Sequence, residues 1–163
     1  MRSSELCYLG LGSNLEDPVN QVRTAIDKIA NLPSCELLKQ SSLYQSKSML
    51  NGQPDYINAV IAIATQLSAH DLMQALIAIE SSQGRLRNGT RWQARTLDID
   101  ILLFANANIK EADLVIPHYG LKQRAFVLVP LFEIAPELIF PDGDALIHYL
   151  TATRINEVIK YEA

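Results

Sequence analysis

Two aspartates one residue apart, Asp98 and Asp100, carry the clearest chemical signal in the sequence. They lie in the stretch TLDIDILLF, whose alternation of polar and apolar residues predicts a β-strand. Because successive side chains of a strand point to opposite faces, both carboxylates should emerge on one face, roughly 6 to 7 Å apart. Adjacent carboxylates repel unless a cation compensates them, and Mg²⁺ leaves coordination positions for substrate phosphates. The pair predicts a magnesium site for nucleotide chemistry; the alternative is two solvated acids on an exposed strand.

A cluster of arginines comes just before the aspartates. Four of the eight arginines in the chain fall within eleven residues, namely Arg85, Arg87, Arg91 and Arg95. Guanidinium groups are planar forks that match phosphate oxygens and stay charged at any working pH. The net charge is only −4 and the pI about 5.3, so we expect a local polyphosphate site and no binding of nucleic acid or membrane by the whole surface. A surface salt bridge remains the alternative for any single arginine.

Several aromatic and amide side chains are candidates for binding a flat heterocycle. Trp92 is the only tryptophan and lies inside the arginine-rich segment, where an indole ring can stack on a ligand. Tyr56, Asn58 and Phe126 can add to such a surface, although packing in the core is the default for Phe126. These residues favour a cyclic organic substrate beside the phosphates.

A second group of polar residues follows the aspartates along the chain. His118 and Tyr119 are able to hydrogen-bond a nucleotide, and Lys122 and Arg124 can add positive charge for phosphate. Glu80 lies at the edge of the apolar stripe of a predicted helix and can point into a cleft. A partly exposed acid at the end of the helix is an equally good interpretation of Glu80.

The elements that must position these residues alternate along the chain. The patterns predict strands at 6–11, 36–46, 56–67 and 96–104, a helix with Asp17 as its N-cap, and a second helix at 68–82. Polar stretches at 47–55 and 84–95 are predicted loops. The segment 116–132 should hold a loop and another strand, and the turn at 141–143 should precede a short C-terminal helix. The order β-α-β-β-α-β predicts an α+β sandwich related to the ferredoxin-like fold, a mainly antiparallel sheet with packed helices.

Length and composition predict one domain, residues 1–163. The chain is 48% hydrophobic, enough to bury a core without disulfides or structural metal. Cys7 and Cys35 form no CxxC or zinc-ligand spacing, which favours reduced thiols and a cytoplasmic protein. Neither a signal peptide nor a membrane span is predicted.

Six separate motifs, in one order, resemble those of the hydroxymethyldihydropterin pyrophosphokinases over nearly the whole chain. They are GLGSN, QPDYINA, E-x3-GRxR, RWxxRTLDIDILLF, PHYxxxxRAFVLVPL and EIAPEL. The resemblance implies that ATP transfers pyrophosphate to the hydroxymethyl group of 6-hydroxymethyl-7,8-dihydropterin, releasing AMP, in folate synthesis. It also implies two Mg²⁺ ions on Asp98 and Asp100. Arg85 and Arg95 would contact the phosphates, and Arg87 and Arg91 would lie in a loop that closes over ATP.

The remaining roles follow from the same resemblance. It implies nucleotide contacts for Glu80, Ile101, His118, Tyr119 and Arg124. It implies pterin contacts for Tyr56, Asn58, Trp92 and Phe126. We expect a monomer whose partners are ATP and the pterin.

The sequence also departs from the family pattern. Gln93 replaces the usual glycine, Ile77 replaces a polar nucleotide contact of some members, and the loop 46–52 is short. Two other functions are compatible with the same residues. One is another Mg²⁺-dependent phosphotransferase or phosphohydrolase, which would need no pterin. The other is a regulatory module that binds a nucleotide without turnover.

Overall fold

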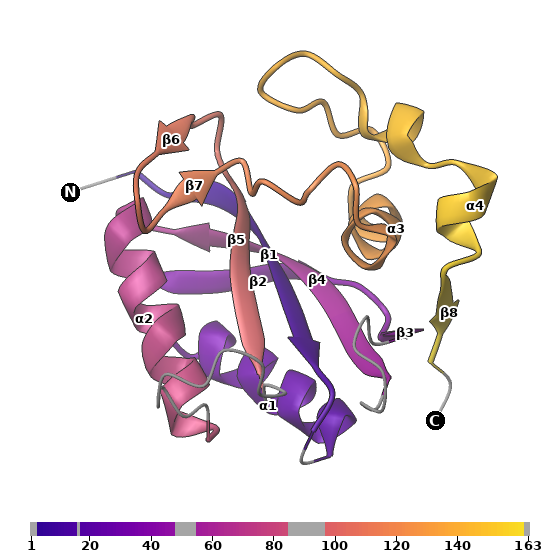
Figure 1. The fold of residues 1–163 in the computed structure, drawn as a ribbon. Helices are drawn as coiled ribbons and strands as arrows, with labels where there is room; N and C mark the ends of the chain where they lie inside the picture. Colours follow the sequence, from indigo (N-terminus) through magenta and orange to yellow (C-terminus); the bar gives the residue numbers. More distant parts are fainter. Residues whose placement is uncertain (1–2, 16, 48–54, 85–96, 162–163) are drawn as a thin grey trace.

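The computed structural model describes residues 3–15, 17–47, 55–84 and 97–161 (Figure 1). The strands of the main sheet are β1 (Glu5–Ser13), β2 (Cys35–Gln40), β3 (Tyr44–Ser46), β4 (Tyr56–Thr65), β5 (Asp98–Phe104) and β8 (Val158–Lys160). A separate hairpin consists of β6 (Ile109–Lys110) and β7 (Val115–Ile116). The helices are α1 (Pro18–Ala30), α2 (Ala69–Ser82), α3 (Ala125–Ile134) and α4 (Ala152–Ile155), with a 3-10 turn η1 (Leu146–Tyr149).

The main sheet is antiparallel and follows the order β5-β1-β4-β3-β8, with β2 also paired to β4. This confirms the predicted α+β class. The single strand predicted at 36–46 is two short strands along one edge of β4. The break falls at Ser41, whose hydroxyl accepts a hydrogen bond from the Val60 N–H at 3.0 Å. The Ser41 side chain thus takes the place of a backbone carbonyl as acceptor for the Val60 N–H.

Helices cover both faces of the sheet, so the core has two layers (Figure 1). On one face, α1 and α2 bury Val22, Ile29 and Leu72 against the sheet. The spacing of these residues confirms the predicted helical stripes. On the other face, α3 buries Leu128 and Leu131. The sheet therefore separates two apolar compartments.

The two long helices begin differently. Ser68 caps α2, because its side chain accepts a hydrogen bond from the Asp71 N–H at 3.1 Å. Asp17 occupies the N-cap position of α1 before Pro18, as predicted, but its side chain makes no capping hydrogen bond. The backbone of Asp17 is left-handed, with φ 63°, and its carbonyl accepts from the Gln21 N–H at 3.0 Å.

The strand predicted within 116–132 is wrong, because residues 125–134 form the helix α3. An unbroken apolar run does not distinguish a buried strand from a buried helix. Here the helix has little polar face because neighbours surround it: Leu128 packs toward the sheet, while Phe126 and Val129 pack against Tyr44 and Val158. Tertiary contacts, and not the periodicity, determine this element.

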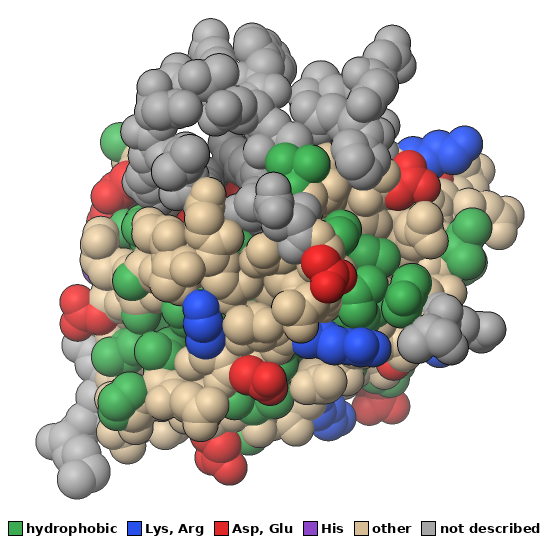
Figure 2. Space-filling view, turned by 90° about the horizontal axis from the view of Figure 1, so that it is seen from below, with side chains coloured by type: hydrophobic (Ala, Val, Ile, Leu, Met, Phe, Trp, Pro, Cys, Tyr) green, Lys and Arg blue, Asp and Glu red, His purple; other side chains and the backbone are tan. Residues whose placement is uncertain are grey.

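The distribution of charge on the surface agrees with the modest net charge. Figure 2 shows acidic and basic side chains interspersed on one face of the molecule. The state of the cysteines agrees with the predicted reduced thiols. Both cysteines are free, and burial raises the pKa of Cys7 to about 12, which keeps this thiol protonated. Within the described ranges, the helices are too short or too polar to cross a bilayer.

Candidate functional site

The aspartate pair lies on β5, at one end of the sheet order. Ile99 and Ile101, only 8% and 7% exposed, point into the core between α2 and the sheet. Asp98 and Asp100 therefore point to the opposite face, and the side chain of Asp100 is 45% exposed. This arrangement confirms the predicted alternation along the strand. It leaves two accessible oxygen donors side by side, which is the ligand chemistry that Mg²⁺ prefers.

Glu80 approaches the same strand from α2. It is 3% exposed, and its carboxylate accepts a hydrogen bond from the Ile99 N–H at 2.8 Å. Ile99 is the residue between the two aspartates. Glu80 thus makes a structural contact to β5, the strand that carries Asp98 and Asp100. The resemblance implies a nucleotide contact in addition.

His118 lies over the aspartate pair, with Nε2 3.8 Å from Oδ2 of Asp100. Its Nδ1 accepts a hydrogen bond from the Gly120 N–H at 3.1 Å, so in the neutral ring the proton belongs on Nε2. Burial, opposed by Asp100, lowers the pKa of His118 and favours this neutral ring. The imidazole can therefore donate one hydrogen bond toward Asp100 or toward a ligand beside it.

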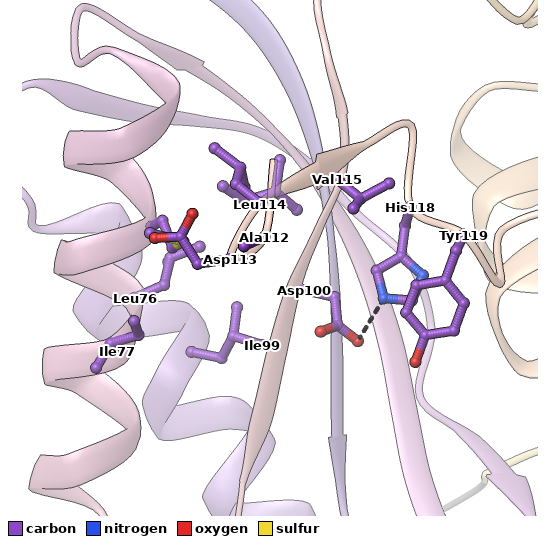
Figure 3. A pocket seen from close by; sticks show the side chains of 12 residues that line it. Leu76, Ile77, Ile99, Asp100, Ala112, Asp113, Leu114, Val115, His118 and Tyr119 are labelled. Carbon is purple, nitrogen blue, oxygen red and sulfur yellow. Dashed lines mark ion pairs between the residues drawn. The ribbon is translucent and has the colours of Figure 1, made fainter. Parts of the chain in front are cut away.

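A cavity of about 260 Å³ opens between α2, β5 and the β6–β7 hairpin (Figure 3). Its apolar part is formed by side chains of the helix, strand and hairpin, among them Met73, Leu76, Ile77, Ile99, Ile101, Leu114 and Val115. Asp100, His118 and Tyr119 line its polar end, and Tyr119 stacks on His118 with centroids 4.5 Å apart. Asp113 also lines the cavity, so with two carboxylates in its wall the cavity suits a ligand with an apolar part and a metal-bound part.

The residues predicted to contact a pterin come from β4 and α3. Asn58 on β4 pairs with Gly12 on β1, and Gly12 pairs with Asp98 on β5. Paired residues of an antiparallel sheet point to the same face, so Asn58 and Asp98 share a face, roughly 10 Å apart across β1. Gly12 keeps this row open, since a Cβ there would lie 3.0 Å from Oδ1 of Asn58. Tyr56 lies two residues from Asn58 on the same face.

Arg124, at the N-cap position of α3, connects the two groups of residues. Its guanidinium carbon lies 5.2 Å from the ring centroid of Tyr119, which lines the cavity, and 5.7 Å from that of Phe126. These are cation–π distances. The charge of Arg124 thus lies at the junction between the cavity and the predicted pterin face.

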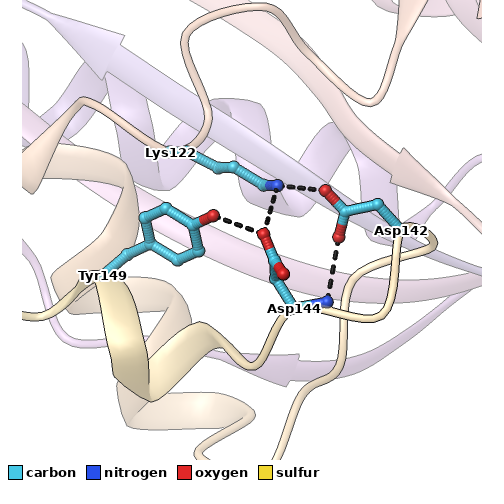
Figure 4. A network of polar contacts seen from close by, with 4 residues as sticks. All are labelled: Lys122, Asp142, Asp144 and Tyr149. Carbon is cyan, nitrogen blue, oxygen red and sulfur yellow. Dashed lines mark hydrogen bonds and ion pairs between the residues drawn. The ribbon is translucent and has the colours of Figure 1, made fainter.

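Lys122 does not join this junction. Its ammonium group pairs with Asp142 and Asp144, and Asp144 also accepts a hydrogen bond from Tyr149 (Figure 4). The hydrogen bond to Asp142 is the main cause that raises the pKa of Lys122. The network ties the turn before α3 to the C-terminal segment, so the phosphate contact expected from the sequence is not supported for Lys122.

The comparisons with known proteins agree on one family. A sequence profile of the 7,8-dihydro-6-hydroxymethylpterin-pyrophosphokinase (HPPK) family matches residues 8–136. The chain is 44% identical to 2-amino-4-hydroxy-6-hydroxymethyldihydropteridine pyrophosphokinase of Haemophilus influenzae over 154 residues, covering 94% of this chain and 96% of the relative. The chain belongs to the HPPK family. A pyrophosphokinase of Pseudomonas aeruginosa is 45% identical over 146 residues, 89% of this chain and 90% of the relative.

Solved structures of HPPK-DHPS from Plasmodium falciparum share the fold. The wild type with pterin and p-hydroxybenzoate has a TM-score of 0.70 at 13% identity, covering 91% of this chain. A variant with pteroate has a TM-score of 0.73 at 12% identity, covering 98% of this chain. The chain spans 43% and 47% of those two longer chains. At this identity the likeness concerns the fold alone.

The structure brings some of the predicted site residues together around one cavity. Ile101, His118 and Tyr119 line the cavity, with Arg124 beside Tyr119. Five predicted site residues lie outside the described residues: Arg85, Arg87, Arg91, Trp92 and Arg95.

Sequence reasoning missed the β6–β7 hairpin as part of the cavity wall. Leu114 and Val115 line the cavity, but an apolar pair after a polar turn gives no sign of contact with α2 or β5. It also missed the place of Gly12, which the predicted strand 6–11 left outside but which lies inside β1. A glycine within a strand often marks the close approach of another group.

Proposed function

We propose a division of roles among the residues of this pyrophosphokinase. The chain catalyses ATP-dependent transfer of pyrophosphate to 6-hydroxymethyl-7,8-dihydropterin in folate biosynthesis. The hydroxymethyl oxygen forms a bond to the β-phosphorus of ATP, the bond from that phosphorus to the αβ-bridging oxygen breaks, and AMP leaves. The observation that carries the assignment of roles is the row Asp98, Gly12 and Asn58 across three strands, beside a cavity that ends at Asp100.

Asp98 and Asp100 are the proposed magnesium ligands. Their carboxylates share one face of β5, and Asp100 lines the polar end of the cavity. Two bound Mg²⁺ ions would neutralise charge on the triphosphate and orient its oxygens. Glu80 supports the pair from behind, because it fixes the backbone of Ile99.

The nucleotide occupies the cavity in this proposal. Leu76, Ile101 and Leu114 offer apolar contact to the base, and the triphosphate extends toward Asp100. His118 donates a hydrogen bond from Nε2 to a phosphate oxygen, since its Nδ1 is already engaged by the Gly120 N–H. The charge of Arg124 lies close enough to the same end to favour the anion.

The pterin lies on the face that carries Asn58 and Phe126. Asn58 is 7% exposed, and its side-chain amide donates to the Ser46 hydroxyl at 2.8 Å, so its orientation is fixed before the ligand arrives. Its amide can hydrogen-bond the heterocycle, while Phe126 and Tyr56 offer ring faces. Trp92 would complete the stacking surface.

Catalysis then depends on positioning and charge neutralisation. Transfer at the β-position spreads negative charge along the whole triphosphate, so several cations are needed at once. Arg85 and Arg95 would supply them beside Arg124. Arg87 and Arg91 would help to exclude water, which limits wasteful hydrolysis of ATP.

We also propose that residues 1–163 work as one domain, as a monomer in the cytoplasm. The single family profile that matches residues 8–136, most of the chain, supports the one-domain proposal. Light scattering after gel filtration tests this point. A mass of one chain, 18.1 kDa, is expected.

The first experiment combines the purified protein with Mg-ATP and 6-hydroxymethyl-7,8-dihydropterin and separates the nucleotides. AMP that forms only with the pterin supports the proposed roles as a set. ADP, or loss of ATP without pterin, would indicate a phosphotransferase or hydrolase. Binding of ATP without any product would indicate a regulatory module.

A further inference from the structure

Gly120 lies buried directly beneath the side chain of Arg124, in the turn that leads from β7 to α3. A Cβ built on Gly120 would lie 2.7 Å from Cζ and 2.9 Å from Cδ of Arg124, and closer still to Nε. These separations are below van der Waals contact. Any residue other than glycine would force the guanidinium of Arg124 to move.

The backbone conformation does not require glycine at this position. Among the described glycines, left-handed φ values occur at Gly84 and Gly143, and Gly120 is not one of them. An L-residue can therefore adopt the local backbone. The requirement for glycine comes from the space that Arg124 occupies.

We propose that Gly120 is a positioning residue for pyrophosphoryl transfer, because its missing side chain lets Arg124 fold back onto the turn. In this pose the guanidinium lies between Tyr119 on the cavity side and Phe126 on the pterin side. The inference rests on the proposed role of Arg124 and goes beyond it by assigning its position to residue 120. Displacement of the guanidinium would remove the cation from the place where the two substrates meet.

Gly120 has two separable contributions to the site. Its N–H donates to Nδ1 of His118 at 3.1 Å, which sets the donor at Nε2. Its Cα surface supports Arg124. Substitution by alanine keeps the backbone N–H and adds only the Cβ, so the variant perturbs Arg124 and leaves the His118 hydrogen bond in place.

The steric conflict involves the far part of a flexible side chain. Arg124 is partly exposed and Nη2 lies 3.5 Å from the Tyr119 hydroxyl, which is the limit of a hydrogen bond. We therefore expect the guanidinium to swing toward solvent in the variant and the fold to persist. A residue with a purely structural role would instead lose stability and keep its kinetic constants.

The test is a double-mutant cycle of Gly120→Ala and Arg124→Ala, assayed by AMP formation and by thermal unfolding. We expect Gly120→Ala to unfold near the wild-type temperature and to lose about tenfold in kcat/KM for ATP, the loss expected for a charge-assisted contact. In the Arg124→Ala background the same substitution should have no further effect, since no guanidinium is left to displace.

Wild-type kinetics for Gly120→Ala, or an equal loss in both backgrounds, would overturn the proposal. If Gly120→Ala does not fold, the double variant decides: restored folding supports the collision with Arg124, and failure to fold refutes it. The proposed function is tested separately, by AMP formation in the wild type. If the wild type forms no AMP, calorimetric titration with Mg-ATP alone still measures and compares the ATP affinity of the four proteins of the cycle.

Discussion

The carboxylate of Glu80 on α2 accepts a hydrogen bond at 2.8 Å from the backbone N–H of Ile99 on β5. β5 is the last strand in the sheet order, and among the described residues no strand pairs with its outer edge. Glu80 supplies the acceptor there. The bond fixes the one residue that separates Asp98 from Asp100, so the position of the proposed metal ligands depends on a helix as well as on the sheet.

Replacement of Glu80 by alanine should affect both stability and activity. The Ile99 N–H would lose this charged acceptor in a buried place, which costs about 2 kcal/mol. Since the strand of the aspartate pair would be held less firmly, turnover should also fall. Glu80→Gln keeps an acceptor oxygen and should lie between the wild type and the alanine variant in urea unfolding and in AMP formation.

Glu137→Ala is the control for this comparison, because Glu137 is an exposed acid. Its stability should stay within about 0.5 kcal/mol of the wild type. Wild-type stability and turnover for Glu80→Ala would show that the bond to Ile99 has no role in holding the pair.

Substitution of Asp98 or Asp100 by asparagine should abolish turnover and preserve the fold. The amide has nearly the same shape, and these side chains face away from the core that holds Ile99 and Ile101. A neutral oxygen binds Mg²⁺ far more weakly than a carboxylate. Either variant should therefore show little AMP formation at any Mg²⁺ concentration, with a thermal midpoint close to that of the wild type.

Asp71→Asn is the matched control, because Asp71 is exposed at the start of α2. It should retain wild-type turnover. Full activity of Asp98→Asn and Asp100→Asn would remove both residues from the proposed metal site.

The parts of the fold that were predictable are those with local signals. The alternation along β5 determined the face of Asp98 and Asp100, and the stripe of α1 determined its buried side. The helix α3 was not predictable in this way, because Phe126 and Leu128 pack on opposite sides of an almost wholly apolar segment. At the break between β2 and β3, the Ser41 hydroxyl accepts a hydrogen bond from the Val60 N–H, a contact that no periodicity reveals.

The motifs name the residues of the candidate site, whereas the contacts among those residues come only from the structure. His118 and Tyr119 were expected at the nucleotide and do line the cavity. Glu80 was expected there too, but its bond to Ile99 joins residues from different elements. Such a long-range contact leaves no trace in the spacing of the sequence. The same holds for Gly120, whose importance arises only because Arg124 lies above it.

Removal of the Tyr44 hydroxyl should give a pH-dependent loss of stability. Tyr44 donates to Glu133 at 2.6 Å, and Ser42 donates to the same carboxylate. Burial raises the pKa of Glu133, but these hydrogen bonds outweigh it and hold the pKa below 4.5. A lowered carboxyl pKa stabilises the fold above the unfolded value, and this stabilisation is lost as the pH falls through the folded value.

Tyr44→Phe should therefore cost about 1 kcal/mol at neutral pH and less as the pH falls below about 4. Urea unfolding at several pH values measures the difference from the wild type. Tyr8→Phe, at a half-buried tyrosine in the compartment of α3, is the control. A difference that is constant over this pH range would contradict the assignment to Glu133.

The hydrogen bond between His70 and Glu111 should act as a pH-dependent latch on the wall of the proposed nucleotide cavity. Nε2 of His70, in the first turn of α2, lies 2.6 Å from Oε2 of Glu111, which lies between β6 and β7. The same hairpin carries Leu114 and Val115 into the cavity wall. The bond to Glu111 is the main cause that raises the pKa of His70 above 6.5, with smaller contributions from Asp113 and Asp71.

Because the pKa of His70 is raised in the fold, its stabilising contribution is complete below pH 6.5 and is lost as the pH rises through the folded value. Glu111→Gln should therefore lower the thermal midpoint relative to the wild type at about pH 6, and the two proteins should converge by about pH 9. Since the hairpin forms one wall of the cavity, KM for ATP should rise in the variant over the same acidic range. Glu157→Gln, at an exposed acid before β8, should match the wild type throughout. A difference in thermal midpoint between the wild type and Glu111→Gln that grows toward alkaline pH would be opposite to the expected trend and would exclude this latch.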